Sequence, residues 1–429
     1  MTTAETRLRE RLRNVEDPAL DGDIVSLGLI EDIRIVDDTA EISLAFNAPY
    51  ATDEMAMGDR IREVCSELGL EASLSVSLSW QDADSPLPDV RNIIAVSSGK
   101  GGVGKTTVAT NLATALSEAG ARVGLLDGDI YGPNVPSMIG VDGEPGLTDD
   151  ETLVPPEAYG VKLISMGFLA QENTDPAMLR GPMIDNILTQ LIEHVEWGDL
   201  DYLVVDLPPG TGDAQLTLLQ TVPLTGAIVV TTPEDVALED VRKGVRMFTD
   251  HGTPILGVVE NMSGFTCSNC GDHHEIYGSG GGRKIADEYD IPLLGEIPID
   301  PEIRAGTDTD GPVAALKDGP TAESFADFAG GVANRVGAVN RAEVAGVDPD
   351  DPESPTEPPA DWYLEATGAE GTDDSESDPT ADGTETEVDS EESVEESVDE
   401  QADESTDDTD DDETTAKPSG GLDLSDDSA

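Results

Sequence analysis

The sequence predicts an α/β protein with a mostly parallel sheet flanked by helices, because apolar runs alternate with helical patterns over residues 91–341. Short apolar runs rich in β-branched residues are typical of strands that a parallel sheet buries on both faces. These runs lie at 92–96, 123–127, 201–206, 226–232, 255–261 and 291–300. A helical pattern at 322–336 closes the region. We therefore expect helices on both faces of the sheet.

The first apolar run leads into a glycine-rich loop, Ser98–Thr107, and then into a helical pattern that ends near Gly120. Its glycines let successive backbone N–H groups turn onto phosphate oxygens, and the helix N-terminus adds partial positive charge. With both flanks present, the G-x-x-x-x-G-K-T pattern predicts a phosphate-binding loop rather than a glycine-rich turn. Lys105 would hold the β- and γ-phosphates of ATP, and the Thr106 hydroxyl would ligate Mg²⁺. The predicted ATP-binding residues of the loop are Gly99, Lys100, Gly101, Gly102, Val103, Gly104, Lys105, Thr106 and Thr107.

Two later runs each deliver aspartates where a strand ends. Asp127 and Asp129 follow one run, and Asp206 ends the next run before a loop rich in proline and glycine. Ligands of α/β sheets bind beyond the carboxyl ends of the strands, so these carboxylates should face the phosphates. We expect Asp206 to hold the Mg²⁺ water shell through Thr106. The alternative is that Asp127 and Asp129 cap turns.

A C-x-x-C motif, Cys267 and Cys270, follows the run 255–261, with His273 and His274 close behind. The residues alone leave three interpretations open. Two thiols and two imidazoles could form a structural zinc site. A redox dithiol needs its first cysteine at a helix N-terminus, which the following glycine and histidines disfavour. In the third interpretation, two chains each give both cysteines to one [4Fe–4S] cluster across a two-fold axis.

Residues 1–80 predict a separate small α/β domain, joined to the rest by a proline-bearing linker at 81–90. Cys65 falls within its second helix, where we expect a small buried hydrophobic residue rather than a ligand. The helical patterns lie at 5–15 and 57–68, and the strand patterns lie at 32–36, 40–46 and 72–78.

The chain is strongly acidic, with a net charge of −68. After Arg341 there are 34 acidic residues and one basic residue, so residues 342–429 predict a disordered acidic tail. The remaining body is acidic and poor in lysine, which suggests adaptation to high salt, and we expect a halophilic archaeon as the source. The alternative is an acidic mesophilic protein with a disordered tail. We expect no binding to nucleic acid or to an anionic membrane. Three cysteines, no signal-like segment and no long apolar run indicate a cytoplasmic protein.

Lys100, a second lysine at the start of the loop, resembles the deviant Walker ATPases such as the MinD and ParA types. Further motifs are similar to the Mrp/ApbC family of iron–sulfur cluster carriers. These motifs are Asp129-Ile-Tyr-Gly-Pro-Asn, Arg180-Gly-Pro-Met, Asp206-Leu-Pro-Pro-Gly-Thr-Gly-Asp, Thr232-Pro-Glu-Asp-Val-Ala-Leu, and Val259-Glu-Asn-Met-Ser with the C-x-x-C after it. The similarity runs to about residue 337. The N-terminal region also resembles iron–sulfur assembly domains, but its loop at 46–51 lacks the cysteine that several relatives carry.

The resemblance implies an ATP hydrolase that works as a homodimer. In such ATPases the lysine at the position of Lys100 reaches the partner's nucleotide, and the aspartate at the position of Asp129 polarises the attacking water. Lys100, Lys105 and Asp129 would then be the catalytic residues. Asn261 would read the adenine edge, with a loop-capping role as the alternative.

The resemblance further implies that Cys267 and Cys270 hold a [4Fe–4S] cluster shared by two chains. Apo iron–sulfur proteins would receive the cluster, and assembly scaffold proteins would be further partners. The alternatives are a MinD/ParA-like positioning ATPase and an ATP-regulated zinc-binding scaffold that uses His273 and His274.

Overall fold

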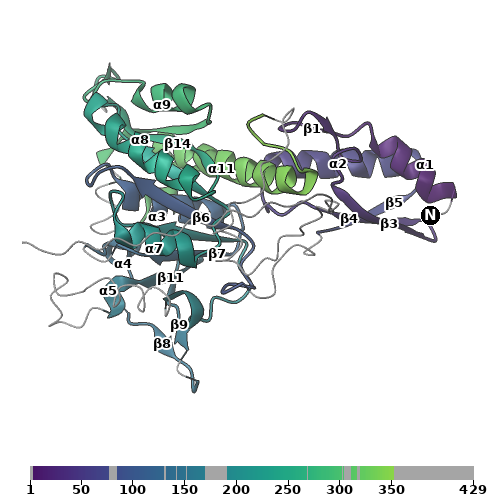
Figure 1. Ribbon diagram of the computed structural model, residues 1–429, viewed down its shortest axis with the longest axis horizontal. Helices are drawn as coiled ribbons and strands as arrows, with labels where there is room; N and C mark the ends of the chain where they lie inside the picture. The colour runs from purple at the N-terminus through teal and green to yellow at the C-terminus, as the bar shows by residue number, and fades with distance from the viewer. Residues whose placement is uncertain are drawn as a thin grey trace, which may run out of the picture. The chain divides into compact units, whose positions relative to one another are not determined.

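The computed structural model of the chain describes residues 3–76, 85–129, 132–141, 143–150, 152–169, 191–267, 269–301, 303, 311–315 and 319–351. The acidic tail from residue 352 onward and the Arg180-Gly-Pro-Met motif lie outside these residues. The described elements form an N-terminal region and a larger region built on a nine-stranded sheet (Figure 1).

The N-terminal region combines two helices with a three-stranded sheet in the order β3-β4-β5. β3 and β4 are antiparallel, whereas β4 and β5 are parallel. Leu8, Ile42 and Ile61 are fully or almost fully buried in its core, and Cys65 is buried with them, as the sequence predicts. The elements are α1 (Thr3–Leu12), β1 (Glu16–Asp17), β2 (Gly22–Asp23), β3 (Ile30–Val36), β4 (Thr39–Leu44), α2 (Thr52–Glu67) and β5 (Glu71–Val76).

The large sheet has the strand order β10-β11-β7-β12-β6-β13-β14-β15, and β16 also pairs with β14. Its central strands are parallel, whereas β10 and β15 pair antiparallel with their neighbours. Parallel β7, β12 and β6 lie side by side, so the segments that follow them emerge at one edge. The strands are β6 (Ile93–Ser98), β7 (Val123–Asp127), β10 (Glu157–Ala158), β11 (Val161–Ser165), β12 (Tyr202–Asp206), β13 (Gly226–Thr231), β14 (Ile255–Thr266), β15 (His273–His274) and β16 (Leu293–Ile299).

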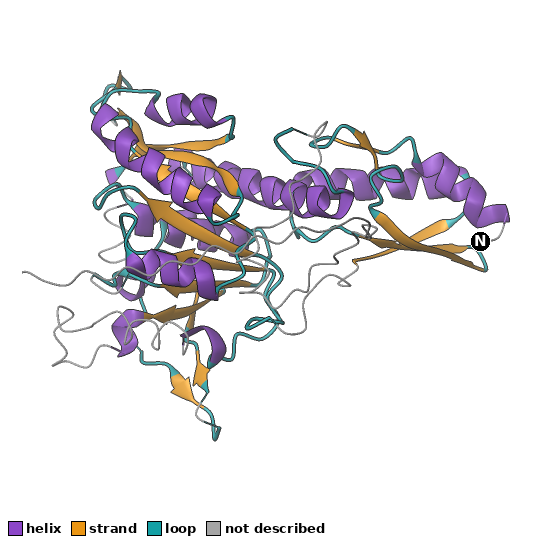
Figure 2. Cartoon of the chain, viewed as in Figure 1, coloured by secondary structure: helices purple, strands orange, loops and turns teal. Residues whose placement is uncertain are grey.

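Helices cover both faces of this sheet, as expected (Figure 2). One apolar cluster joins the sheet to α3 (Lys105–Glu118) and α11 (Pro320–Ala345), and a second joins it to α7 (Asp213–Thr221), α8 (Asp235–Asp250) and α9 (Gly281–Tyr289). Shorter elements lie between them: α4 (Val135–Ile139), the pair β8 (Gly146–Leu147) and β9 (Leu153–Val154), α5 (Met166–Leu169) and a 3₁₀ turn (Val313–Ala315).

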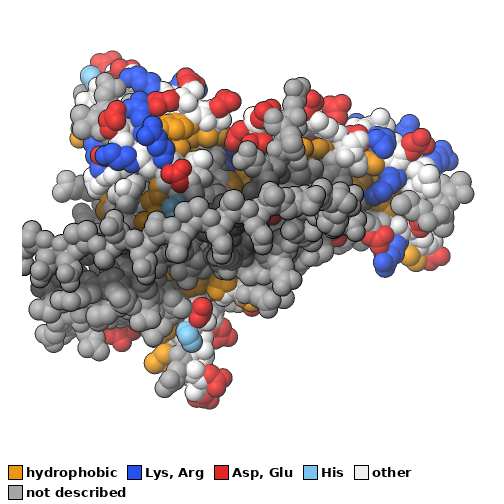
Figure 3. Space-filling model, in the orientation of Figure 1, with side chains coloured by type: hydrophobic (Ala, Val, Ile, Leu, Met, Phe, Trp, Pro, Cys, Tyr) orange, Lys and Arg blue, Asp and Glu red, His pale blue; other side chains and the backbone are white. Residues whose placement is uncertain are grey.

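Ion pairs tie α8 to α9 at the surface. Arg242 of α8 lies 2.8 Å from Glu288 of α9 and 2.7 Å from Glu239. On the face drawn in Figure 3, basic side chains gather over these two helices beside acidic ones. Exposed pairs of this kind contribute little stability, about 0–1 kcal/mol each, so the apolar clusters beneath them dominate the packing.

Several expected element boundaries are wrong. The helix expected at 5–15 spans Thr3–Leu12. The strand expected at 255–261 continues to Thr266. Met262 interrupts it with a left-handed conformation (φ 60°), but the chain then pairs again with β15 and β16. The helix expected at 322–336 spans Pro320–Ala345, since buried residues continue to Ala342. The helix expected at 57–68 begins earlier, at Thr52.

None of the helices described has both the length and the apolar character that crossing a membrane requires.

Candidate functional site

The phosphate loop connects β6 to α3 at the edge of the sheet where the strands end. Gly102 and Gly104 have φ values of 84° and 83°, which residues with a Cβ rarely adopt. Gly104 is also the N-cap of α3, so the loop turns directly into the helix N-terminus. A Cβ on Gly99 would lie 2.3 Å from the Asp240 backbone carbon, so this glycine is required by close packing.

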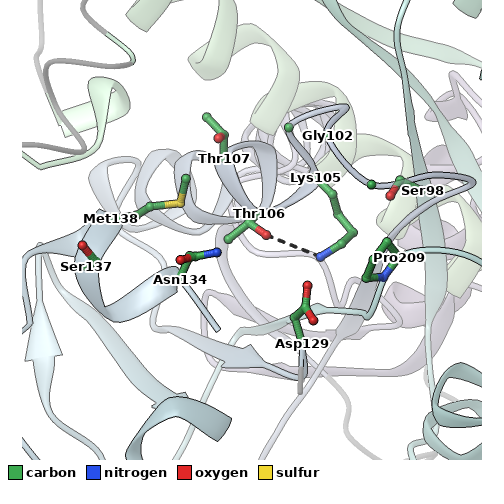
Figure 4. Close-up of a pocket in the computed structure, with 12 residues that line it drawn as sticks. Ser98, Gly102, Lys105, Thr106, Thr107, Asp129, Asn134, Ser137, Met138 and Pro209 are labelled. Atoms are coloured by element: carbon green, nitrogen blue, oxygen red, sulfur yellow. Dashed lines mark hydrogen bonds between the residues drawn. The ribbon is translucent and has the colours of Figure 1, made fainter. Parts of the chain in front are cut away.

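The loop borders a cavity of about 430 Å³ (Figure 4). Many predicted site residues lie on its wall, and α4 with the residue before it adds side chains from the opposite side. The lining residues are Ser98, Gly101, Gly102, Gly104, Lys105, Thr106, Thr107, Asp129, Asn134, Ser137, Met138 and Pro209. The cavity therefore combines backbone N–H groups, one lysine, hydroxyl groups and a carboxylate, which suits a phosphate chain.

Asp206 contacts the side chains of Lys105 and Thr106, the first two residues of α3. Its carboxylate lies 2.6 Å from Lys105 Nζ and accepts a hydrogen bond from Thr106 Oγ1 at 2.7 Å. Asp206 is fully buried and Lys105 is 5% exposed. Burial raises the pKa of Asp206, while Lys105 and Thr106 act in the opposite direction. Asp206 and Thr106 thus lie in direct contact, and the role expected for them at Mg²⁺ stays a prediction.

Asp127 anchors the turn that carries Asp129. Its buried carboxylate accepts hydrogen bonds from the backbone N–H groups of Asp129 and Val135, at 3.2 and 3.3 Å. It also accepts one from Ser165 Oγ at 2.8 Å. Burial and the nearby Asp206 raise the pKa of Asp127 to about 7. Asp127 therefore holds both ends of the segment 129–135, whereas Asp129 lines the cavity.

Several residues of this site carry little signal in the sequence. Asn134, Ser137 and Met138 line the cavity. They were not predicted because α4 is only five residues long, too short for a clear helical period. Ser165 is the parallel-sheet partner of Asp127 at the end of β11. The run 161–165 that forms β11 was not among the expected strands, so the position of Ser165 at a strand end gave no signal.

Two predicted site residues, Lys100 and Asn261, each contact another residue of the same chain. Lys100 Nζ lies 3.4 Å from Glu234 and is partly exposed. Asn261 Nδ2 donates to the Val103 carbonyl at 2.8 Å, and Asn261 is only 5% exposed. The roles expected for Lys100 at a partner's nucleotide and for Asn261 at adenine stay predictions.

Cys267 and Cys270 lie in a tight turn directly after β14. Cys267 N–H donates to the Asp272 carbonyl at 2.9 Å, and Gly271 N–H donates to the Cys267 carbonyl at 2.8 Å. Hydrogen bonds from the backbone N–H groups of Cys270 and Asn269 lower the pKa of the Cys267 thiol, which favours the thiolate that metals bind. Cys270 is exposed and Cys267 is partly so.

The two histidines do not complete a zinc site with these thiols. His273 and His274 are consecutive residues of β15, so their side chains point to opposite faces of the strand. Among the residues that the structure describes, no three Cys, His, Asp or Glu side chains are grouped closely enough to hold a metal ion.

Comparison with known proteins resolves the class. The model for NUBPL iron-transfer P-loop NTPases matches residues 89–333. The chain belongs to this family. A second model, for iron–sulfur cluster assembly proteins, matches residues 5–77 of this NTPase. The family match confirms the expected P-loop fold and an ATP hydrolase, and the second match confirms the resemblance of the N-terminal region.

Relatives of this NTPase named "Iron-sulfur cluster carrier protein" occur in Synechocystis sp. and Escherichia coli K12. The first is 42% identical over 338 residues, 76% of this chain and 96% of the relative. The second is 42% identical over 310 residues, 69% of this chain and 82% of the relative. Among solved structures, a nucleotide-binding protein in complex with ADP from Archaeoglobus fulgidus is 36% identical and covers 56% of this chain and 94% of its own (TM-score 0.49).

Proposed function

We propose that this NTPase carries a [4Fe–4S] cluster between two copies of the chain and delivers it to apo iron–sulfur proteins, in a cycle driven by ATP hydrolysis. Assembly scaffold proteins would supply the cluster. We propose the cytoplasm as the site of this exchange, with no nucleic acid or membrane as a partner. The names of the relatives support the carrier role.

The observation that carries this proposal is the cysteine turn after β14. It offers two accessible thiols on one short turn. Cys270 Sγ donates to the Asp272 carboxylate at 3.3 Å, but within the described part of the chain no three such side chains are grouped closely enough to hold a metal ion. A [4Fe–4S] cluster takes four thiolates. Two copies related by a two-fold axis supply that number, because an isologous contact brings the same turn from each copy together.

The nucleotide cavity supports the ATP-driven part of the cycle. Backbone N–H groups of the loop and Lys105 would neutralise the phosphate charge, and Asp129 would orient the attacking water. Thr106 and Asp206 provide the oxygen ligands that Mg²⁺ prefers, directly or through water. Thr106 lines the cavity, and its 2.7 Å contact places the buried Asp206 carboxylate directly behind it. When bound there, Mg²⁺ would offset the charge on the phosphates.

The homodimer would also complete the nucleotide site. Lys100 is partly exposed, and among the described residues its ammonium contacts Glu234 alone, at 3.4 Å; the Glu234 side chain is 44% exposed. A weak surface pair of this kind is easily exchanged for a better partner. We propose that in the dimer Lys100 leaves Glu234 and contacts the nucleotide of the other chain.

Anaerobic reconstitution with iron and sulfide tests the carrier role. The wild type should hold about four irons per two chains, with broad visible absorption, and should transfer them to an apo-protein. The double variant C267A/C270A should hold none. The matched control is C65A, since Cys65 is fully buried and should not affect iron content.

Two results would overturn the proposal. Iron bound equally by C267A/C270A would place the cluster elsewhere. Tightly held zinc at about one ion per chain, with no iron, would favour a structural metal site instead.

A further inference from the structure

β14 joins the phosphate loop to the cysteine turn within six residues. In this strand, Asn261 Nδ2 donates to the Val103 carbonyl of the phosphate loop at 2.8 Å. A Cβ on Gly104 would lie 2.2 Å from the same nitrogen, so the amide lies directly against the point where α3 begins. Cys267 follows the last residue of the strand. One strand therefore contacts both functional parts of the chain.

The same amide also supports a kink in the strand. Asn261 Oδ1 accepts a hydrogen bond from Met262 N–H at 3.0 Å. Met262 has φ 60°, a conformation that is uncommon for residues other than glycine and is held by its surroundings. The pairing of β14 with β16 shifts in register between Asn261 and Phe265. The kink thus lies immediately next to the residue that contacts the phosphate loop.

Beyond the kink, the cysteine turn is firmly attached to the strand. Thr266 and Phe265 pair with His273 and His274 across the turn. Gly264 lies against the His273 ring, because a Cβ there would be 2.4 Å from a ring carbon. A displacement of β14 after Met262 must therefore move the whole turn, including both thiols.

We propose that Asn261 is a positioning residue that couples occupancy of the phosphate loop to the accessibility and reactivity of Cys267 and Cys270. When phosphates bind, the backbone of Val103 and Gly104 adjusts to them. The buried Asn261 amide follows, since a buried donor left unpaired is unfavourable. Its movement changes the kink at Met262 and hence the cysteine turn. This inference rests on the proposed function, in which the same two thiols hold the cluster.

Alkylation of the thiols by iodoacetamide, followed by mass spectrometry, tests the coupling without any iron. The full-length protein is compared without nucleotide and with saturating Mg-ADP or a non-hydrolysable ATP analogue. In the wild type we expect the rate at Cys267 or Cys270 to change about fivefold or more, the size of a typical coupling between sites. Fully buried Cys65 serves as the internal unreactive thiol.

The decisive variant is N261A, with nucleotide binding measured separately so that saturation is assured. Its alkylation rates should be the same with and without bound nucleotide. Asn111 offers a matched control: it also contacts the α3 backbone, donating to the Thr107 carbonyl at 2.9 Å, but its other partner is Ala314. N111A should keep the wild-type response. An N261A protein that keeps the response, or a wild type without one, overturns the proposal.

A measurement on the wild type keeps the test decisive if N261A does not fold. Hydrogen–deuterium exchange of a peptide covering 262–274 should change on nucleotide binding, because its turn amides at Cys267 and Gly271 are hydrogen-bonded within the turn. Unchanged exchange would refute the coupling. Failure of iron reconstitution with a normal alkylation response would refute the carrier role alone.

Discussion

Arg341 of α11 is the cation that holds two buried carboxylates of the N-terminal region, and its removal should be severely destabilising. Its Nε lies 2.6 Å from Asp17, and its Nη1 lies 3.0 Å from Glu54. The Arg341 and Asp17 side chains are fully buried, and that of Glu54 is 8% exposed. R341A leaves both carboxyl groups in place without a counter-ion.

The expected cost follows from this burial. Removing one partner of a buried ion pair costs about 3–5 kcal/mol, because the other charge remains desolvated. Arg335, on the same helix, supplies a matched control. The side chain of Arg335 is 10% exposed and that of its partner Asp350 is 34% exposed, so water can still reach the carboxylate that R335A leaves behind. The structure therefore predicts that R341A costs more stability than R335A, because R341A leaves two buried carboxyl groups unpaired.

Urea unfolding followed by circular dichroism at pH 7.5 measures both costs. The triple variant R341M/D17N/E54Q, which removes the charges together, should recover most of the stability lost in R341A. If R341A costs no more stability than R335A, the contacts of Arg341 with Asp17 and Glu54 do not hold the N-terminal region against α11, and the prediction is wrong. If the triple variant is as unstable as R341A, the loss comes from packing rather than from unpaired charge.

Two further predictions concern the nucleotide site, and a third concerns the buried Glu54. K105A should lower the rate of phosphate release from ATP by about 10²-fold or more, as loss of a charge-stabilising group does; a loss below tenfold would contradict the role of the Lys105–Asp206 pair. D129N should keep nucleotide affinity but lower hydrolysis by about 10²–10⁴-fold, and equal losses of both would make Asp129 a binding residue. Burial raises the pKa of Glu54 from 4.5 to about 7, so the native state holds this proton more tightly than the unfolded state does. The free energy of unfolding should therefore lose a contribution as the pH rises from about 4.5 to about 7, and E54Q should lack it; parallel pH profiles would exclude this role.

Local sequence signals were sufficient for the centre of the nucleotide site. A buried strand, a glycine loop and a helix follow one another without interruption, and Asp206 ends a neighbouring strand. Because parallel strands deliver their ends to one edge, the contact between Lys105 and Asp206 follows from topology once the strands are recognised. The separation of these residues by about a hundred positions therefore did not hide their association.

Other contacts had no local signal. Arg341 and Asp17 are 324 residues apart and belong to a helix and a two-residue strand; nothing near either residue specifies its partner. The continuation of β14 beyond Asn261 was missed because polar residues after an apolar run are typical of a strand end. The sequence does not show the left-handed conformation of Met262. Only pairing with β15 and β16 keeps that segment extended, and such pairing depends on the whole sheet.

The contacts of the N-terminal region argue for a role in supporting the nucleotide-binding sheet. The Asn47 carbonyl accepts a hydrogen bond from Asn92, and the Pro49 carbonyl accepts one from the Tyr202 hydroxyl, both at 2.7 Å. Asn92 immediately precedes β6 and Tyr202 begins β12, the strands whose other ends carry the phosphate loop and Asp206. The loop at 46–51 thus uses its backbone to fix the starts of these two strands. Because extended strands are stiff, fixing their starts also restrains the positions of their functional ends.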